Sequence, residues 1–137
     1  MPIFGVDIPF ASHCGIEALD HSDGETLLRL VLAPEHLNNL GVAHGGVTST
    51  LLDIAMGSAA RRQVDLPVMT LDMQVSFIAT GRGVLLAQGR VLRAGRSVIF
   101  GEGEVKDESG ELVAKGSGLF KPVRSLQEAL PSLGGSA

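Results

Sequence analysis

The chain has 137 residues, of which 45% are hydrophobic and 19% are charged, so one domain over 1–137 can bury a core of its own. A formal net charge of −4, five Phe and no Trp or Tyr exclude a general nucleic-acid binder, which needs a basic face and aromatic platforms for bases. One cysteine, the absence of a signal-peptide pattern near the start, and the lack of roughly 18 uninterrupted apolar residues lead us to expect a cytoplasmic protein without a membrane partner.

The first elements predicted are two strands joined by a tight turn. Apolar residues alternate over 16–19 and 25–32, and the turn signal His21-Ser22-Asp23-Gly24 lies between the two runs. We therefore expect a β-hairpin over 15–33. A polar, turn-rich connection follows over 34–41.

Residues 46–62 are predicted to form one long buried helix. Apolar side chains recur at helical spacing at Val47, Leu51, Ile54 and Ala55, and other small or apolar residues extend this surface round most of the circumference. A helix that is apolar on nearly all sides is a buried one. Only its last turn, with Arg61 and Arg62, is expected to be solvated.

Between Pro67 and the C-terminal tail, the chain is predicted to form strands joined by short loops. The expected strands are 68–79, 83–94, 97–107 and 112–121. Because the loops between them are short, we expect each loop to join antiparallel neighbours. One apolar helix within a run of antiparallel strands predicts an α+β fold in which a curved sheet wraps around the helix. The tail over 123–137 is expected to hold one short helical segment, 125–129, and a loose end.

Asp53 is the first candidate for catalysis, because it lies on the helix that is predicted to be buried. Its helical neighbours are the small or apolar residues Ser49, Thr50, Met56 and Gly57. Burying a carboxylate without a partner is energetically unfavourable, and such a group more often has a functional role than none. The alternative, that Asp53 faces a wet cleft or hydrogen-bonds Thr50 and a neighbouring strand, stays open.

Gly45 and Gly46 begin the same helix, where backbone N–H groups are open to a ligand at the positive end of the helix dipole. Such donors can hold a developing oxyanion, whereas a tight turn is the purely structural interpretation of the pair. Gly45 and Asp53 lie eight residues apart, which is about 12 Å along one helix. Both would have to act at one reacting carbon, so the spacing predicts a base from a partner chain and two shared sites in a two-fold dimer.

Three more polar residues are candidates with a structural alternative. His44 could polarise a carbonyl or fix the loop, Asn38 could donate its amide N–H or serve turn chemistry, and Thr70 could support a water or simply favour a strand. His36 and His44 do not complete a metal site, because no cysteine and no acidic residue except Glu35 lies near them in the sequence. We expect no metal.

Basic residues gather late in the chain, at Arg82, Arg90, Arg93, Arg96, Lys121 and Arg124. Arg93 and Arg96 flank a tight turn, where they could contact the phosphates of a nucleotide-like ligand. Solvated surface charge is the other interpretation of these residues.

One stretch matches a known family. The run Asn38-x-x-Gly41-x-x-His44-Gly45-Gly46, followed by Leu52-Asp53 and an alanine-rich helix, resembles the PaaI-like acyl-CoA thioesterases (the phenylacetate-degradation type) of the hotdog-fold superfamily. The segment that begins at Thr70 and the Gly95-Arg96 turn also look like that family. The resemblance covers residues 10–122.

The resemblance implies the hotdog fold, two subunits that join their sheets, and a homotetramer of two such dimers. It also implies hydrolysis of an aryl- or medium-chain acyl-CoA to the acid and free CoA. No cofactor is then needed, because CoA is part of the substrate.

Roles for single residues follow from the same resemblance. The Gly45 N–H would polarise the thioester carbonyl, with Asn38 and His44 helping to place it. Asp53 of the opposite subunit would activate water or attack directly, and Thr70 would support that water. The substrate-binding residues would be Gly46, Arg93, Gly95 and Arg96, of which the Gly95-Arg96 region would lie near the CoA phosphates.

Two alternative functions stay open. A hotdog hydratase or dehydratase would need an acid–base pair that moves a proton on the acyl chain, whereas this motif offers groups that polarise a carbonyl. A non-enzymatic acyl-CoA-binding hotdog protein could keep the pocket and omit the base, yet Asp53 is present.

Overall fold

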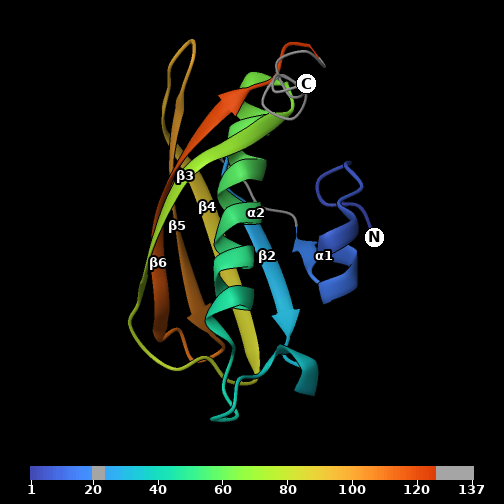
Figure 1. The fold of residues 1–137 in the computed structure, drawn as a ribbon, viewed down its shortest axis with the longest axis vertical. Helices are drawn as coiled ribbons and strands as arrows, with labels where there is room; N and C mark the ends of the chain where they lie inside the picture. The colour runs from blue at the N-terminus through green and yellow to red at the C-terminus, as the bar shows by residue number, and fades with distance from the viewer. Residues whose placement is uncertain (20–23, 126–137) are drawn as a thin grey trace, which may run out of the picture.

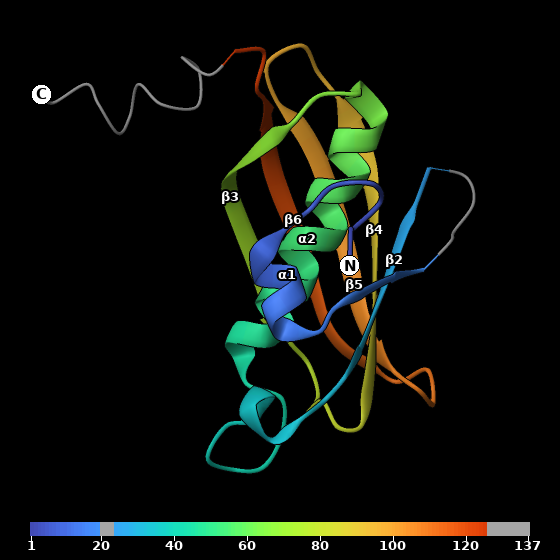
Figure 2. The same ribbon diagram turned by 90° about the vertical axis from the view of Figure 1, so that its right-hand side faces the viewer.

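The computed structural model describes residues 1–19 and 24–125, which form a six-stranded antiparallel sheet curved around one long helix (Figure 1). The elements in chain order are α1 (Pro9–Cys14), β1 (Glu17–Leu19), β2 (Thr26–Val31), the 3-10 helix η1 (Pro34–His36), α2 (Gly45–Val64), β3 (Val68–Phe77), β4 (Val84–Ala94), β5 (Ile99–Asp107) and β6 (Leu112–Pro122). The sheet is not closed, because β1 and β3 are its two edges within the described residues. Figure 2 shows α1 in front of α2, on the side away from the sheet.

This architecture confirms the predicted hotdog fold. The helix predicted over 46–62 is observed as α2, and each of the four predicted late strands is present within a few residues of its expected bounds. The β1–β2 hairpin is also confirmed, with Glu17 opposite Arg29. Most of its turn signal, and all but the first residue of the short helical segment expected at 125–129, lie outside the described residues.

The prediction that every short loop joins neighbouring strands is wrong for the loop between β3 and β4. The strand order is β1-β2-β4-β5-β6-β3, so β3 pairs with β6 and lies at the edge of the sheet. The connecting residues 78–83 cross to the middle of the sheet, and the Gly81 carbonyl accepts a hydrogen bond from the Ala43 N–H on the way. Local periodicity identifies a strand, whereas its partner depends on how the sheet curves around α2.

The N-terminal region holds two features that the sequence analysis did not predict. The six residues of α1 are too few for a periodic pattern, and the helix ends at Gly15 in the left-handed region with φ of 78°. Arg61, which was expected to be solvated, is half-buried, because one guanidinium nitrogen donates to the carbonyl oxygens of Ile3 and Phe4. Arg62 lies over the Phe4 ring, with the guanidinium carbon 4.8 Å from the ring centroid. The two arginines thus hold the N-terminal loop against the end of α2.

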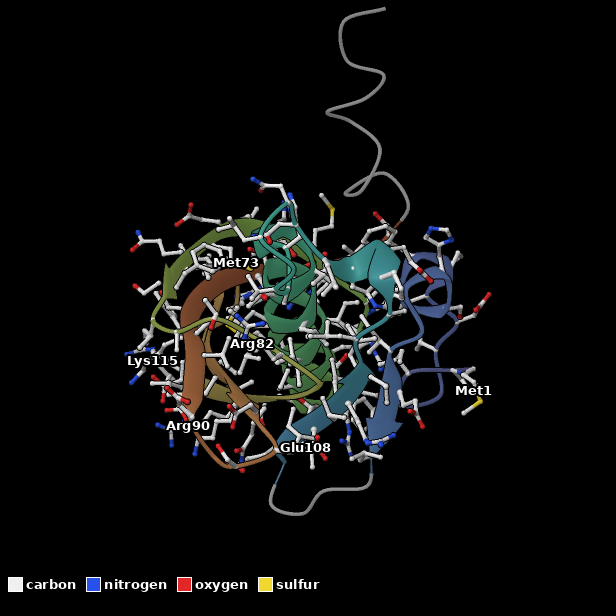
Figure 3. All side chains as sticks on the ribbon, turned by 90° about the horizontal axis from the view of Figure 1, so that it is seen from below. Met1, Met73, Arg82, Arg90, Glu108 and Lys115 are labelled. Atoms are coloured by element: carbon white, nitrogen blue, oxygen red, sulfur yellow. The ribbon has the colours of Figure 1, made fainter. Side chains whose placement is uncertain are left out.

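The helix lies directly on the sheet because glycine faces it at the point of closest approach. A Cβ added to Gly89 of β4 would lie 2.4 Å from the backbone carbonyl of Ala55 in α2. Beside this contact, the buried hydroxyl of Thr26 donates to the Ala55 carbonyl oxygen at 2.6 Å. Figure 3, which looks along α2, shows the sheet bent around the helix, with Arg90 and Lys115 pointing away from it.

We expect Gly89→Ala to destabilise the fold. The new methyl group would force the α2 backbone away from β4, and overpacking of this kind lowers the free energy of unfolding by about 1–3 kcal/mol, or more where backbone has to move. Urea unfolding followed by circular dichroism measures the change. The control is Gly110→Ala on the open β5–β6 turn, where no atom lies within 4 Å of the added Cβ and only the strain of its φ of 88° is added. A stability loss at Gly89 no larger than at Gly110 would contradict the close-packing argument.

Candidate functional site

The start of α2 presents one backbone N–H for a ligand. The Nδ1 atom of His44, the N-cap residue, accepts a hydrogen bond from the Gly46 N–H at 2.8 Å. The Gly45 N–H, at the first helical position, has no backbone acceptor among the described residues. Since Nδ1 accepts, a neutral His44 ring carries its proton on Nε2 and can donate from there. His44 therefore fixes the loop, as one interpretation expected, and leaves Gly45 and its own Nε2–H available.

Asn38 builds the loop that leads into α2. Its Oδ1 atom accepts from the N–H groups of Leu40, at 2.9 Å, and Val42, at 3.3 Å. The turn interpretation of Asn38 is therefore correct for the oxygen atom. The amide nitrogen makes no hydrogen bond with the described part of the chain, so it can still donate to a ligand.

His36 has a structural position. Its Nδ1 atom accepts from the Ala33 N–H at 2.9 Å, and its Nε2 atom lies 2.8 Å from the Cys14 carbonyl oxygen. Nδ1 thus holds the backbone of the loop itself, and Nε2 ties the loop to α1. Across residues 1–19 and 24–125, no three His, Cys, Asp or Glu side chains lie together as a metal site would require.

Asp53 is half-buried in the middle of α2 and is held from the neighbouring strand. The Thr70 hydroxyl on the edge strand β3 donates to Asp53 Oδ1 at 2.6 Å. Thr50, the other expected partner, donates instead to the Gly46 carbonyl oxygen at 2.8 Å. The Oδ2 atom of Asp53 has no hydrogen-bond partner within the described ranges, so it is free to accept a proton from a water molecule.

The helix start and Asp53 open into different hollows of the same chain. His44 and Gly46 line a hollow of about 440 Å³, together with Val47, Thr50 and side chains of α1. Asp53 and Thr70 line another, of about 270 Å³. The two sets of lining residues share no member. One chain therefore does not bring Gly45 and Asp53 to a common reacting atom, in line with the eight-residue spacing between them.

The predicted phosphate-binding turn lies at the opposite end of the molecule from Gly45. Ile99 pairs with Phe120 and Val68 pairs with Pro122, which places the β4–β5 turn beside the C-terminal end of α2. The turn itself requires glycine, because a Cβ on Gly95 would lie 2.8 Å from the Val98 carbonyl oxygen. Its side chains Arg93 and Arg96 are exposed. The side chains of Arg93 and Arg96 are thus accessible to a ligand, but they lie at the other end of the molecule from Gly45 of their own chain.

Most residues that surround Asp53 were not predicted from the sequence. They are Val6, Ile8, Ile54, Gly57, Ser58, Arg61 and Pro67, which line its hollow. For the helical members, a signal was present: Gly57 and Arg61 follow Asp53 at intervals of four residues and so share its face. No comparable signal exists for Val6 and Ile8, because only the tertiary structure brings the N-terminal loop to this point.

Cys14 is half-buried. Burial raises the pKa of its thiol above the ordinary value. The thiol is therefore kept protonated at neutral pH, which leaves Cys14 a poor nucleophile.

Three comparisons with known proteins agree on the family and the fold of this chain. A family model described as the Thioesterase superfamily matches residues 40–114. An esterase candidate from Halobacterium salinarum is 34% identical over 126 residues, which cover 82% of this chain and 83% of that protein. A Bacillus halodurans protein, crystallised with CoA, is 35% identical with a TM-score of 0.81 and covers 87% of this chain and 81% of its own. The E. coli PaaI protein has a TM-score of 0.80 at 21% identity, over 85% of this chain and 86% of that one, a likeness of fold alone.

Proposed function

Because this chain belongs to the Thioesterase superfamily and is a thioester hydrolase, we propose that it cleaves an aryl- or medium-chain acyl-CoA to the acid and free CoA. The family resemblance read from the sequence is confirmed by the Thioesterase superfamily model and by the 34% identical esterase relative, and PaaI shares the fold. The Asp53 carboxylate carries the proposal: one oxygen is fixed by Thr70 and the other is free in a hollow. The relative that was crystallised with CoA supports CoA as the leaving group.

We propose that the site forms between two subunits. Asp53 and Gly45 of one chain lie about 12 Å apart along α2, and Asp53 lines a different hollow from the residues His44 and Gly46 on either side of Gly45. A two-fold dimer with antiparallel α2 helices would place Gly45 of one subunit near Asp53 of the other. The same arrangement would bring the Arg93–Arg96 turn of one subunit to the end where the partner's α2 begins, which suits a CoA molecule that spans both chains.

The edge strand β3 supports such a dimer. It pairs with β6 on one side, and its other edge has no partner within the described residues. Leu71 and Phe77 on this strand are about half exposed, at 50% and 58%. An unpaired edge with apolar side chains favours pairing with another chain. Exposed Leu92 and Phe100, on β4 and β5, favour a further contact between two dimers.

In the proposed reaction, the Gly45 N–H hydrogen-bonds the thioester carbonyl oxygen, and the helix dipole adds positive potential there. Asp53 of the other subunit takes a proton from water through Oδ2 while the water oxygen bonds to the carbonyl carbon. The tetrahedral intermediate then collapses, the carbon–sulfur bond breaks, and the CoA sulfur takes up the proton that Asp53 had accepted. Direct attack by Asp53 would instead break the carbon–sulfur bond, release the CoA thiolate and form an acyl anhydride that water hydrolyses.

The test is release of free thiol from a panel of aryl- and medium-chain acyl-CoAs. Turnover that produces free acid supports the proposal. Tight binding without turnover would favour the acyl-CoA-binding alternative. A change in the acyl chain with the thioester intact would favour a hydratase or dehydratase.

Mixing two inactive variants tests the shared site. Asp53→Asn and Gly45→Pro subunits are denatured together and refolded. Half of the dimers are then hybrids, and each hybrid has one intact site of two, so about a quarter of the wild-type activity should return. No recovery in confirmed hybrid dimers would contradict a site built from two chains.

We expect Thr70→Val to lower kcat about tenfold. The variant removes the hydroxyl that fixes Asp53 Oδ1, and the loss of one hydrogen bond to a charged group is worth about 1.5–3 kcal/mol, reduced at this exposed position. The matched control is Thr70→Ser, which keeps the hydroxyl and should stay near the wild-type rate. Steady-state kinetics on one acyl-CoA measures both. Equal rates for the Val and Ser variants would remove Thr70 from the mechanism.

A further inference from the structure

The hollow beside Asp53 extends along α2 toward the end of the helix. Asp53, Gly57 and Arg61 lie four residues apart and therefore form one row on the helix surface. All three line this hollow, and so does Ser58. Most other walls are apolar and come from Val6, Ile8, Ile54, Pro67 and Val68. The hollow is thus an apolar passage with a carboxylate at one end and a guanidinium further along.

Gly57 keeps the middle of this passage open. Glycine inside a helix weakens the helix relative to alanine, so it needs a reason. Packing does not supply one, because a Cβ on Gly57 would lie 3.4 Å from the nearest atom, Cε1 of Phe120, which is an ordinary contact. Nor does Gly57 have a positive φ. Gly57 lines the hollow between Asp53 and Arg61, and its bare backbone lets a ligand approach the helix closely there.

Ser58 places a polar group in the same passage. Its side chain is only 3% exposed, yet its hydroxyl makes no hydrogen bond with any described residue. No fully enclosed side-chain oxygen or nitrogen among residues 1–19 and 24–125 lacks a hydrogen-bond partner. Since Ser58 lines the hollow, its hydroxyl is placed to donate to a ligand there.

Arg61 brings a positive charge to this region. Only its Nη2 atom is engaged, at 3.0 Å from the Ile3 carbonyl oxygen and 3.2 Å from that of Phe4. The Nε and Nη1 groups have no acceptor within the described ranges. Burial, and then the charge of Arg62, lower the pKa of Arg61 from its ordinary value. A partly buried cation with free N–H groups is best matched by a carboxylate, which can accept two hydrogen bonds.

We propose that the acyl group of the substrate ends in a carboxylate, which Arg61 binds with help from Ser58 while Asp53 acts at the thioester. This inference rests on the proposed function, because it takes the hollow beside Asp53 as the acyl pocket. The substrate class is then the CoA thioester of a dicarboxylic acid. Its chain runs past Gly57 along the apolar wall.

The test compares two substrates that differ only at the far end of the chain, hexanoyl-CoA and adipoyl-CoA. For the wild-type enzyme we expect kcat/KM to be at least about tenfold higher with adipoyl-CoA, the gain of one charge-assisted hydrogen bond. Arg61→Met should reduce this ratio to about one, Arg61→Lys should keep part of it, and Ser58→Ala should lower it less. The control is Arg62→Met, which also loosens the N-terminal loop at Phe4 but does not line the hollow, and it should keep the ratio.

The two proposals fail in different ways. If both thioesters are hydrolysed and hexanoyl-CoA is preferred or equal, the carboxylate inference is wrong and the thioesterase proposal stands. If neither thioester is hydrolysed, the dissociation constants of the two non-hydrolysable thioether analogues are measured, and their ratio replaces the ratio of kcat/KM. Tighter binding of the adipoyl analogue that depends on Arg61 then supports the carboxylate site, and equal binding overturns it. A ratio that falls equally in Arg61→Met and Arg62→Met would assign the effect to the loop and overturn the role of Arg61.

Discussion

Asp53→Asn is expected to lower kcat for acyl-CoA hydrolysis by about 10²–10⁴-fold, with little change in KM. The amide cannot take a proton from water, and general-base catalysis contributes about this factor. The substitution keeps the shape of the side chain, and its amide oxygen can still accept from the Thr70 hydroxyl. Thiol release under steady-state conditions gives kcat, and thermal unfolding confirms that the variant is folded.

The matched control for this loss is Asp72→Asn. Asp72 lies on the same strand as Thr70, just past the β-bulge, but its side chain is exposed and lines a different surface hollow. The control should hydrolyse at the wild-type rate. If Asp53→Asn also stays within a few fold of the wild type, the chemistry lies elsewhere and the proposed site is wrong.

Gly45→Pro is expected to lower kcat by about 10²–10³-fold, the usual loss when one oxyanion donor is removed. Proline has no N–H, so the variant deletes the donor that is proposed to polarise the thioester carbonyl. The backbone should tolerate it, because proline is favoured at the first helical position. His44, the preceding residue, already has the extended conformation that proline requires, with φ of −63° and ψ of 139°. The kcat with an acyl-CoA substrate and the helix signal in circular dichroism measure the two effects separately.

Gly45→Ala shows whether the effect of Gly45→Pro comes from the lost N–H or from the lost space at glycine. It keeps the N–H, and its Cβ would lie 3.4 Å from the Phe77 ring, which is an ordinary contact. Activity close to the wild type in Gly45→Ala, with a large loss in Gly45→Pro, assigns the effect to the N–H. Equal losses in the two variants would mean that the site requires the glycine for space, and the oxyanion role would fail.

Several features of the molecule follow from local sequence. The apolar side chains on nearly every side of α2 predicted a buried helix, and alternation predicted the late strands, because both patterns depend only on neighbouring residues. The spacing of Gly45 and Asp53 also has a local basis, since the rise of a helix fixes their separation. It was enough to predict that one chain does not bring the two residues together at one atom.

Other features were decided by the tertiary structure. The sequence marked β3 as a strand, but only the curvature of the sheet around α2 made β6 its partner. Val6 and Ile8 carry no local signal for a site, yet they line the hollow beside Asp53. Arg61 has the sequence context of a solvated last turn, and it is half-buried because the N-terminal loop folds back onto it. Pairing partners, cavity walls and desolvated charges depend on contacts between distant residues, and local patterns do not encode which distant residues meet.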